Sequence, residues 1–288
     1  MRRKLIIGLC ILVVLLAGIG IYLRNGFYGN CVPERRSLYV RSGSEYRTLE
    51  DSLDTAIAHT AFFRFYARHI ELDRSFKPGH YVLEPGMNVV QVARMLKLGL
   101  QTPVRVTINN VRTPAQLAGK LARQIEADSA TIVGALTDPA TARKAGFDSV
   151  TLFSMFIPDT YEFYWTVSPA QFIERMRREY DRFWTPQRDA KRQRSGLSRL
   201  EVMTLASIVY EETRQSDEMP RIAGVYINRL RKGWPLQADP TVKYALQEFG
   251  LRRILHRHLK YPSPYNTYIN KGLPPSPICM PGRNAIDA

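Results

Sequence analysis

Cysteine is scarce in this sequence, and the residue clusters of a metal centre or a nucleotide site are missing. The 288 residues include three cysteines, and Cys10 lies in an apolar run, so only Cys31 and Cys279 could pair. No disulfide framework follows, and whether these two pair stays open. His256 and His258 lie two residues apart on a predicted exposed basic helix, and this arrangement does not suit a zinc site. Glycine-rich phosphate loops and nucleophile elbows are also missing, so we expect no metal and no cofactor.

Acidic residues are few relative to basic ones. The chain has 26 Asp and Glu against 41 Lys and Arg, a formal charge of +15, which is compatible with nucleic-acid binding. Much of the excess lies in residues 174–194, where acids and aromatics alternate with bases as on a solvated helix face. Attraction to anionic lipid headgroups or to an acidic wall polymer is a second interpretation. We expect no nucleic-acid partner, because the compartment inferred next contains none.

Charge is absent from residues 5–23, an apolar run preceded by Arg2, Arg3 and Lys4. A run of this length can span a bilayer. A cleaved signal peptide would have a shorter apolar region and a small-x-small cleavage site, which the sequence lacks before Arg24. Residues 1–24 are therefore predicted to be a cytoplasmic tip and an uncleaved transmembrane anchor, followed by a short tether. The positive-inside rule places the rest of the chain outside the cytoplasm, on the wall-facing side of a bacterial inner membrane.

A weak internal repeat follows the anchor. Residues 37–53 and 79–96 both combine a Tyr-Val pair, a downstream glycine and a helix with an apolar stripe. Residues 103–125 give a third version, in which Thr113 is placed to cap a helix that starts with Pro114. We predict an α+β module over 37–126 that resembles the LysM type of glycan-binding domain. The alternative is a structural spacer.

Six aromatic residues crowd the stretch 156–172, after an uninformative helical segment. Aromatic side chains at this density either stack on sugar rings or fill a hydrophobic core, and core filling is the commoner outcome.

The helix predicted at 198–213 organises the second half of the chain. Ser198 followed by Glu201 forms a capping box, and Leu205 and Ile208 then recur at helical spacing. Near its end the helix carries two adjacent glutamates.

Helical phase separates these two glutamates. At about 100° per residue, Glu212 falls about 20° from Leu205, whereas Glu211 points about 120° away from the apolar stripe. A carboxyl group on a packed face either pairs with a cation, such as Arg214, or has a raised pKa and becomes a candidate general acid. Both interpretations of Glu212 stay open at this point.

Two more helices and an irregular loop complete the chain. The first is predicted at 222–233, with Asn228 beside its apolar face. The next is predicted to be capped by Asp239 and to begin with Pro240, which gives Asp239 a structural role. Residues 263–278 are too rich in Pro, Asn and Tyr for regular structure and are interpreted as a binding wall.

Four separated motifs together carry a family resemblance: IPDTYEF (157–163), LASIVYEET (205–213), VYINRLRKGWPLQADPTVKY (225–244) and SPYNTYINKGLPP (263–275). They resemble the endolytic murein transglycosylases, the YceG-like, membrane-anchored lytic enzymes that cut peptidoglycan strands. The resemblance implies that Glu212 is catalytic and that residues 127–288 form a mainly helical catalytic domain. It also implies glycan-binding roles for Asn228, Gln237, Asp239, Thr241, Tyr265, Asn266 and Tyr268. For Asn228 and Asp239, binding and structural roles remain equal alternatives.

The activity implied by the resemblance is a lyase reaction. It breaks the bond between MurNAc and GlcNAc, leaves 1,6-anhydro-MurNAc ends, and would terminate or trim nascent strands, with peptidoglycan synthases as candidate partners. A glycan hydrolase and a non-catalytic peptidoglycan-binding scaffold are the alternatives. Two departures stand out. Tyr210 occupies a position where family members often have glutamate, and the family continues past Pro281-Gly282 with a helix and a hydrophobic strand. We therefore expect that a carboxyl-terminal segment is missing after Ala288.

Overall fold

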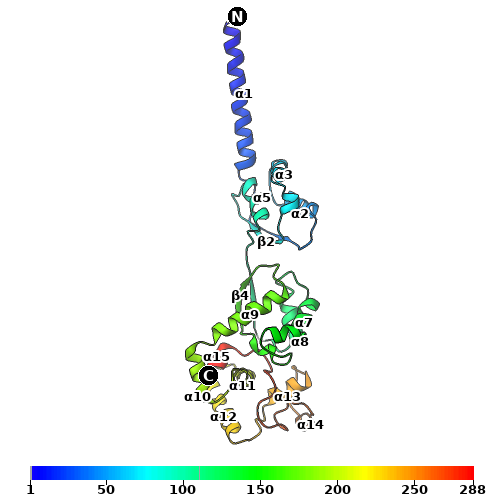
Figure 1. Ribbon diagram of the computed structural model, residues 1–288, viewed down its shortest axis with the longest axis vertical. Coiled ribbons are helices and arrows are strands. Elements are labelled where there is room, and N and C mark those ends of the chain that lie inside the picture. The colour runs from blue at the N-terminus through cyan, green and yellow to red at the C-terminus, as the bar shows by residue number, and fades with distance from the viewer. Residues whose placement is uncertain (1, 110) are drawn as a thin grey trace. The chain divides into compact units, whose positions relative to one another are not determined.

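Two compact units make up the chain. The computed structural model describes residues 2–109 and 111–288. Unit 1 comprises the chain up to Val104 together with 163–166, and unit 2 comprises 105–162 and 167–288. Each mixes helices with a two-stranded sheet, so the predicted α+β class is confirmed (Figure 1).

Unit 1 begins with the long apolar helix α1 (Arg2–Tyr28). The most apolar 18-residue window within its stretch Leu5–Tyr28 has a mean hydropathy of 2.9, and none of that window is buried. This helix is long and apolar enough to cross a membrane, although a signal sequence near the amino terminus has the same properties.

The predicted tether after α1 is wrong. The helix continues to Tyr28, and Cys31 and Val32 are fully buried in the core of unit 1. Asn30 fixes this exit, because its side-chain oxygen accepts hydrogen bonds from the backbone N–H groups of Val32 (3.0 Å) and Gly86 (3.1 Å). Burial of these two apolar side chains holds the segment against the unit, which a sequence pattern of loop residues does not reveal.

The core of unit 1 lies between a sheet and four short helices. Strand β1 (Arg36–Val40) pairs antiparallel with β2 (Gly79–Leu83), with Leu38 opposite Tyr81. The helices are α2 (Tyr46–Asp54), α3 (Thr60–His69), α4 (Leu72–Ser75) and α5 (Val89–Leu98). A capping box of Asn88 and Gln91 starts α5. The likeness of this module to LysM stays a prediction.

Unit 2 contains the second sheet, in which β3 (Val104–Ile108) neighbours β4 (Asp159–Phe163). Its helices before β4 are α6 (Pro114–Leu121), α7 (Ser129–Thr137), α8 (Pro139–Lys144) and the 3-10 turn η1 (Leu152–Met155). After β4 come α9 (Pro169–Phe183), α10 (Pro186–Ser195), α11 (Arg199–Glu212), α12 (Met219–Arg231), α13 (Asp239–Leu246), α14 (His256–Leu259) and α15 (Arg283–Asp287). Thr113 caps α6 as predicted, accepting from the backbone of Gln116 at 3.2 Å.

The aromatic stretch 156–172 mainly fills the core. Phe156, Tyr161, Phe163 and Phe172 are all buried, so the core-filling interpretation is confirmed for these side chains. Tyr164, by contrast, is 57% exposed.

The charged segment 174–194 also behaves as predicted. Helix α9 buries one face, while Arg175, Arg177 and Arg178 form i,i+4 ion pairs with acidic residues of the same helix. The basic residues on this helix are therefore largely matched by local acids.

Helix α11 is the centre of unit 2 and contacts η1, α12, α13 and α15. It begins at the predicted capping box, in which Ser198 and Glu201 exchange hydrogen bonds. Residues 203–209 are consecutively buried, so the helix is covered on every side. Ser207 ties it to the carboxyl-terminal loop, because its hydroxyl accepts from the backbone N–H of Ile278 at 3.0 Å.

The hydrogen bond between Ser207 and Ile278 can be tested by mutation. Ser207→Ala leaves the buried N–H of Ile278 without its acceptor and should lower the free energy of unfolding by about 1–3 kcal/mol. The hydroxyl of Ser52 bonds only within its own helix, to the carbonyl of Thr48, so Ser52→Ala is the matched control and should change stability by less than about 0.5 kcal/mol. Thermal unfolding in detergent measures both, and equal effects would refute the role given to Ser207.

Candidate active site

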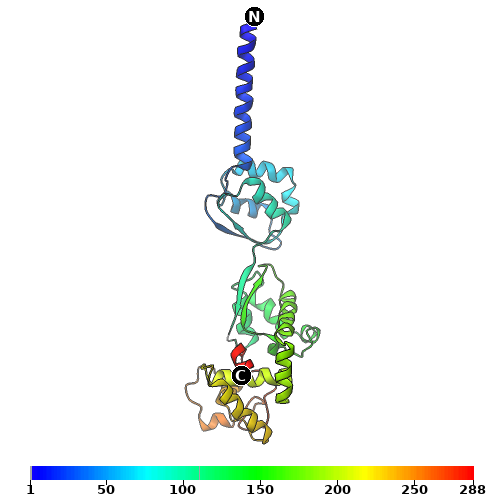
Figure 2. The ribbon, with the colours of Figure 1, turned by 90° about the vertical axis from the view of Figure 1, so that its left-hand side faces the viewer.

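Glu212 ends α11 at the edge of an open groove. The hydroxyl of Tyr226, on α12, donates a hydrogen bond to Glu212 Oε1 at 2.9 Å. Figure 2 shows α12, in yellow, crossing close to the end of α11. The groove has a volume of about 430 Å³ and is lined by Glu212, Thr213, Glu218, Ile222, Val225, Tyr226, Arg229, Gln237, Asp239 and Tyr268.

The sequence-based orientation of the two glutamates is wrong. The Glu211 side chain is 13% exposed and forms an ion pair with Arg112 at 2.7 Å, whereas Glu212 is solvent-exposed. Arg214, the expected partner of Glu212, approaches Glu211 at 3.5 Å instead. Helical phase failed because α11 is buried all round, so no single stripe defines its packed face.

The surroundings of Glu212 favour its protonated form. The groove walls crowd the carboxyl group although the residue as a whole is exposed, and this desolvation is the main cause that raises its pKa. The negative charge of Asp239 raises the pKa further, whereas the Tyr226 hydrogen bond and the charge of Lys243 lower it. In the described part of the chain no ion pair within 4 Å involves Glu212, so its protonation is set by the groove.

Asp239 faces the same groove from the start of α13. Its predicted role as a helix cap is wrong, because Ala238 occupies the N-cap position without any side-chain bond. The Asp239 carboxylate instead accepts a hydrogen bond from the Tyr268 hydroxyl at 2.6 Å. Burial, together with this contact to Asp239, raises the pKa of Tyr268 to about 12. The tyrosine is therefore a neutral donor at ordinary pH.

Gln237 enters the groove from a strained backbone position. Its φ of 52° lies in the left-handed region, which non-glycine residues rarely adopt. The strain is held by Thr267, whose carbonyl accepts from Gln237 N at 3.0 Å and whose hydroxyl accepts from Ala238 N at 3.0 Å. Strain maintained in this way is common where a side chain must point at a ligand.

Three other predicted binding residues have their polar groups engaged within the protein. Thr241 is fully buried and its hydroxyl lies 2.8 Å from that of Thr267. Asn266 is also fully buried, and its amide donates to the carbonyls of Leu259 and Tyr261. The Tyr265 hydroxyl lies 2.6 Å from that of Ser276.

Asn228 is exposed on α12 but is not among the side chains that line the groove. The structure thus brings together Glu212, Gln237, Asp239 and Tyr268 of the predicted set.

Sequence reasoning missed Tyr226, the hydrogen-bond partner of Glu212. Tyr226 lies within the helix predicted at 222–233, two residues before Asn228 in the same motif, but it is not among the predicted site residues. Arg229 was also missed as a lining residue, and it donates to the carbonyl of Leu236. A tyrosine on the face of a helix that follows a glutamate-bearing helix was the available signal.

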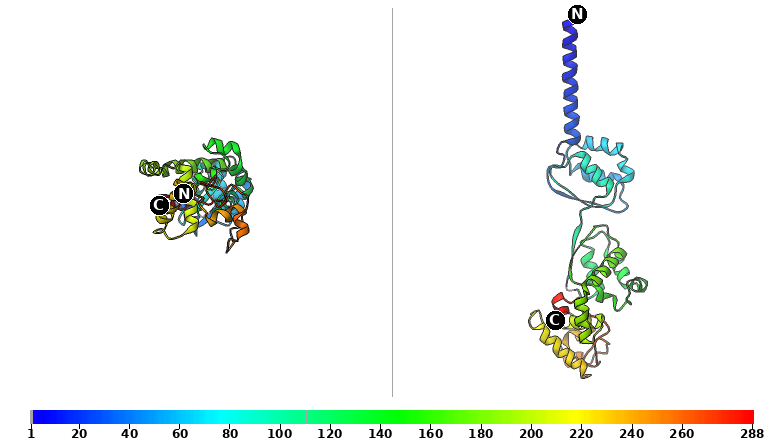
Figure 3. Two further views of the ribbon diagram at one scale, coloured as in Figure 1. Left: turned by 90° about the horizontal axis from the view of Figure 1, so that it is seen from below. Right: turned by 60° about the vertical axis from the view of Figure 1, so that its left-hand side comes forward.

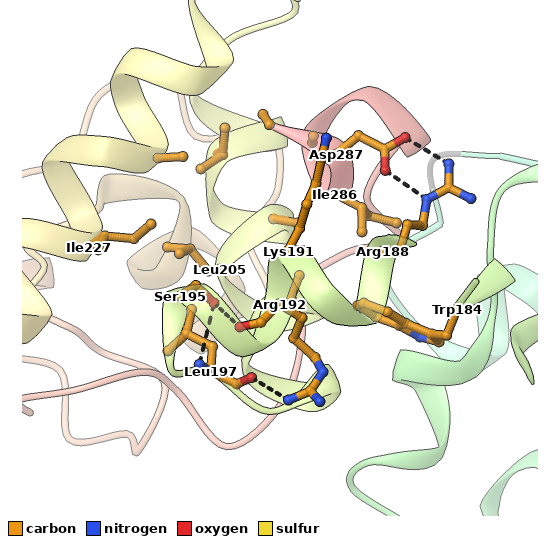
Figure 4. A pocket seen from close by; sticks show the side chains of 16 residues that line it. Trp184, Arg188, Lys191, Arg192, Ser195, Leu197, Leu205, Ile227, Ile286 and Asp287 are labelled. Carbon is orange, nitrogen blue, oxygen red and sulfur yellow. Dashed lines mark hydrogen bonds and ion pairs between the residues drawn. The ribbon is translucent and has the colours of Figure 1, made fainter. Parts of the chain in front are cut away.

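A second cavity, of about 160 Å³, lies between α10, α11, α12 and α15 (Figure 4). Its walls are mostly apolar, and its Asp287 carboxylate accepts two hydrogen bonds from Arg188, at 2.7 and 2.8 Å. This ion pair keeps the pKa of Asp287 low, so the carboxylate cannot serve as an acid. The indole nitrogen of Trp184 is buried there without a described partner. The groove at Glu212 is therefore the better candidate for chemistry.

Among residues 2–109 and 111–288, no group of three or more His, Cys, Asp or Glu side chains is placed to hold a metal ion. Cys31 and Cys279 are both free thiols in the structure.

Comparison with known proteins identifies relatives for most of the chain. The sequence model of the YceG-like family matches residues 38–288. A protein of Bacillus subtilis named endolytic murein transglycosylase is 26% identical over 269 residues, covering 88% of this chain and 74% of that protein. A protein of the same name from Streptococcus pneumoniae is 24% identical, and the match covers 86% of this chain and 51% of that protein.

A solved structure resembles most of the chain. The crystal structure of a YceG-like protein from Listeria monocytogenes has a TM-score of 0.56 and 29% sequence identity to this chain. The match covers 88% of this chain and 89% of that one. The chain thus spans most of that structure but only about half of the pneumococcal relative.

Replacing each of the two adjacent glutamates by glutamine should affect the stability of the fold differently. Glu211→Gln leaves Arg112 without its ion-pair partner and should lower the free energy of unfolding by about 1–2 kcal/mol. Glu212→Gln removes a carboxylate whose raised pKa makes its ionised form unfavourable in the fold, so the melting temperature at neutral pH should stay unchanged or rise. Thermal unfolding of both variants at pH 7 checks this contrast, and a larger loss for Glu212→Gln would contradict it.

Proposed function

Because the chain belongs to the YceG-like family, we propose that it is a peptidoglycan lytic transglycosylase, a lyase that cuts glycan strands internally between MurNAc and GlcNAc. The observation that carries the proposal is the Glu212 carboxyl group. It has a raised pKa, one hydrogen bond from Tyr226 and no ion pair among the described residues, and it faces an open groove. Relatives of this chain that are named endolytic murein transglycosylase support peptidoglycan as the substrate class.

One carboxyl group can perform both proton transfers of this reaction. Protonated Glu212 donates to the glycosidic oxygen, and the bond from that oxygen to C1 of MurNAc breaks. The resulting carboxylate then takes the proton from the C6 hydroxyl of the same MurNAc, whose oxygen attacks C1 and closes a 1,6-anhydro ring. Water is not a reactant, and the glutamic acid is regenerated.

Tyr226 would position the Glu212 carboxyl group for this reaction. Its hydrogen bond occupies Oε1, and Oε2 has no described protein partner, so Oε2 is the oxygen available for proton transfer. Gln237, Asp239 and Tyr268 line the same groove and would bind the sugar hydroxyl and N-acetyl groups. Thr241, Tyr265 and Asn266 would support these residues through their buried hydrogen bonds.

The rest of the chain would deliver this site to the cell wall. Helix α1 would be an uncleaved anchor in the inner membrane, with a cytoplasmic amino terminus and both units on the periplasmic side. The module in unit 1 would bind glycan in the manner of LysM domains. Cutting nascent strands would trim or terminate them, which makes peptidoglycan synthases candidate partners.

A hydrolase is the second candidate, because Asp239 is a second carboxylate in the groove. Hydrolases use such a group to activate water or to form a covalent intermediate. Tyr268 already donates to Asp239, which favours a binding role for that residue over a role as base. A non-catalytic scaffold is the third candidate, and the products decide among the three.

Product analysis of purified peptidoglycan is the direct test. The wild-type protein should release muropeptides with 1,6-anhydro ends, detected by mass spectrometry, and Glu212→Gln should be slower by about 10²–10⁴-fold. Glu174→Gln, in an exposed ion pair of α9, is the control and should keep the wild-type rate. Reducing ends would make the protein a hydrolase, and no cleavage by wild type would favour the scaffold.

The pH dependence of cleavage should shift in opposite directions in two groove variants. The general acid must be protonated, so kcat/KM should fall as pH rises through the pKa of Glu212. Asp239→Asn removes a negative charge that raises this pKa, so the alkaline limb should move to lower pH. Tyr226→Phe removes a hydrogen bond that lowers the pKa, so the limb should move to higher pH.

The control for these profiles is Glu174→Gln, on an exposed ion pair of α9, which should leave the limb in place. Shifts of Asp239→Asn and Tyr226→Phe in the same direction would show that Glu212 is not the group that titrates.

A further inference from the structure

The carboxyl-terminal end of α1, where its apolar run stops, packs against α3. Tyr22 lies within the apolar run, and its ring contacts that of Phe62 on α3 in an edge-on arrangement, with centroids 5.3 Å apart. Phe62 also packs edge-on against Phe27, at 5.0 Å. Phe27 in turn lies 5.9 Å from Phe65, so rings from α1 and α3 form one aromatic cluster. Figure 3 shows α1, in blue, running without a break to the folded part of unit 1, where it contacts α3 and α5.

Gly26 makes this close approach possible. It is buried in α1, four residues after Tyr22 and therefore on the same face of the helix. A Cβ atom at position 26 would overlap the end of the Phe62 ring. The glycine thus lets α3 sit directly on the backbone of α1, at the level of Tyr22.

This geometry sets the depth of α3 relative to any bilayer that α1 spans. From Leu23, the end of the apolar run, to Tyr28 the helix rises about 7.5 Å at about 1.5 Å per residue. The headgroup layer on one side of a bilayer is about 5–7.5 Å thick. Because α1 continues without a break, the contact between Tyr22 and Phe62 falls at the inner edge of that layer and Tyr28 falls at its outer edge.

The outward face of α3 has the composition expected at this depth. Phe65 is 68% exposed, and Tyr28 on α1 is 66% exposed. Arg68 and His69, in the last turn of α3, are exposed as well. Aromatic side chains concentrate at membrane interfaces, and neighbouring bases attract anionic headgroups.

We propose that α3 and the end of α1 form a membrane-docking surface, through which Phe65 and Tyr28 enter the lipid headgroup layer of the bilayer that α1 spans. The inference rests on the proposed role of α1 as an anchor. It adds that unit 1 is fixed to the bilayer surface, whereas a module on a tether would swing freely above it.

Spin labels on the full chain in vesicles of phosphatidylethanolamine and phosphatidylglycerol test this proposal. Cys10, exposed on α1, is the natural label site that reports whether α1 is inserted. In a Cys10→Ser background, Phe65→Cys places the label on the docking surface. Leu98→Cys, at a residue 65% exposed on the same unit but outside the aromatic cluster, is the matched control. Cys31 and Cys279 are buried, and the Cys10→Ser protein alone corrects for their labelling.

The expected result is a label at position 65 that collides severalfold more with lipid-soluble oxygen than with a water-soluble nickel complex, and the reverse at position 98. Adding Gly26→Leu, which displaces Phe62, should return the position 65 label to the aqueous pattern. The same Gly26→Leu change in the protein that keeps Cys10 should leave the Cys10 label lipid-exposed. A lipid-exposed label at Cys10 with an aqueous label at position 65 would overturn the docking surface alone. An aqueous label at Cys10 would overturn the anchor and with it the docking surface, leaving the cleavage activity as a separate question.

Discussion

The ion pair between Arg112 and Glu211 fixes the last turn of α11, and the candidate site depends on it. Successive helical residues project about 100° apart, so holding Glu211 toward Arg112 directs Glu212 away from that contact and into the groove. Arg112 precedes α6, in a segment that lies 99 residues before Glu211. A contact between distant parts of unit 2 therefore orients the carboxyl group that the chemistry would use.

A single acid and base needs a balance of opposing influences on its pKa. Desolvation in the groove and the charge of Asp239 favour the protonated form of Glu212, whereas the Tyr226 hydrogen bond stabilises the carboxylate. If desolvation acted alone, the carboxyl group would stay protonated but would be a weaker acid, and would release its proton to the glycosidic oxygen less readily. The tyrosine also fixes one oxygen, which limits the directions in which the other can transfer a proton.

Local sequence signals predicted local structure well. The capping box at Ser198 and the Thr113 cap set helix starts as expected, because these interactions involve residues three apart. Features that depend on contacts between distant residues could not be predicted from the sequence. The facing of Glu211 and Glu212 depends on helices packed on all sides of α11. Periodicity therefore placed Glu212 on a packed face that it does not occupy, whereas the family motif pointed to Glu212 independently. Asp239 fitted a capping pattern, yet its carboxylate is drawn to Tyr268 on a distant loop.

The motif residues divide into side chains that face the groove and side chains that hold them there. Thr267 links the two groups, because its carbonyl and hydroxyl accept from the backbone on both sides of the strained bend at Gln237. Its hydroxyl also lies against Thr241, which makes this buried pair part of the same support. A left-handed glutamine costs about 1–3 kcal/mol and persists only where neighbouring contacts enforce it. The buried threonines are therefore required for the groove to present Gln237, even though no substrate could touch them.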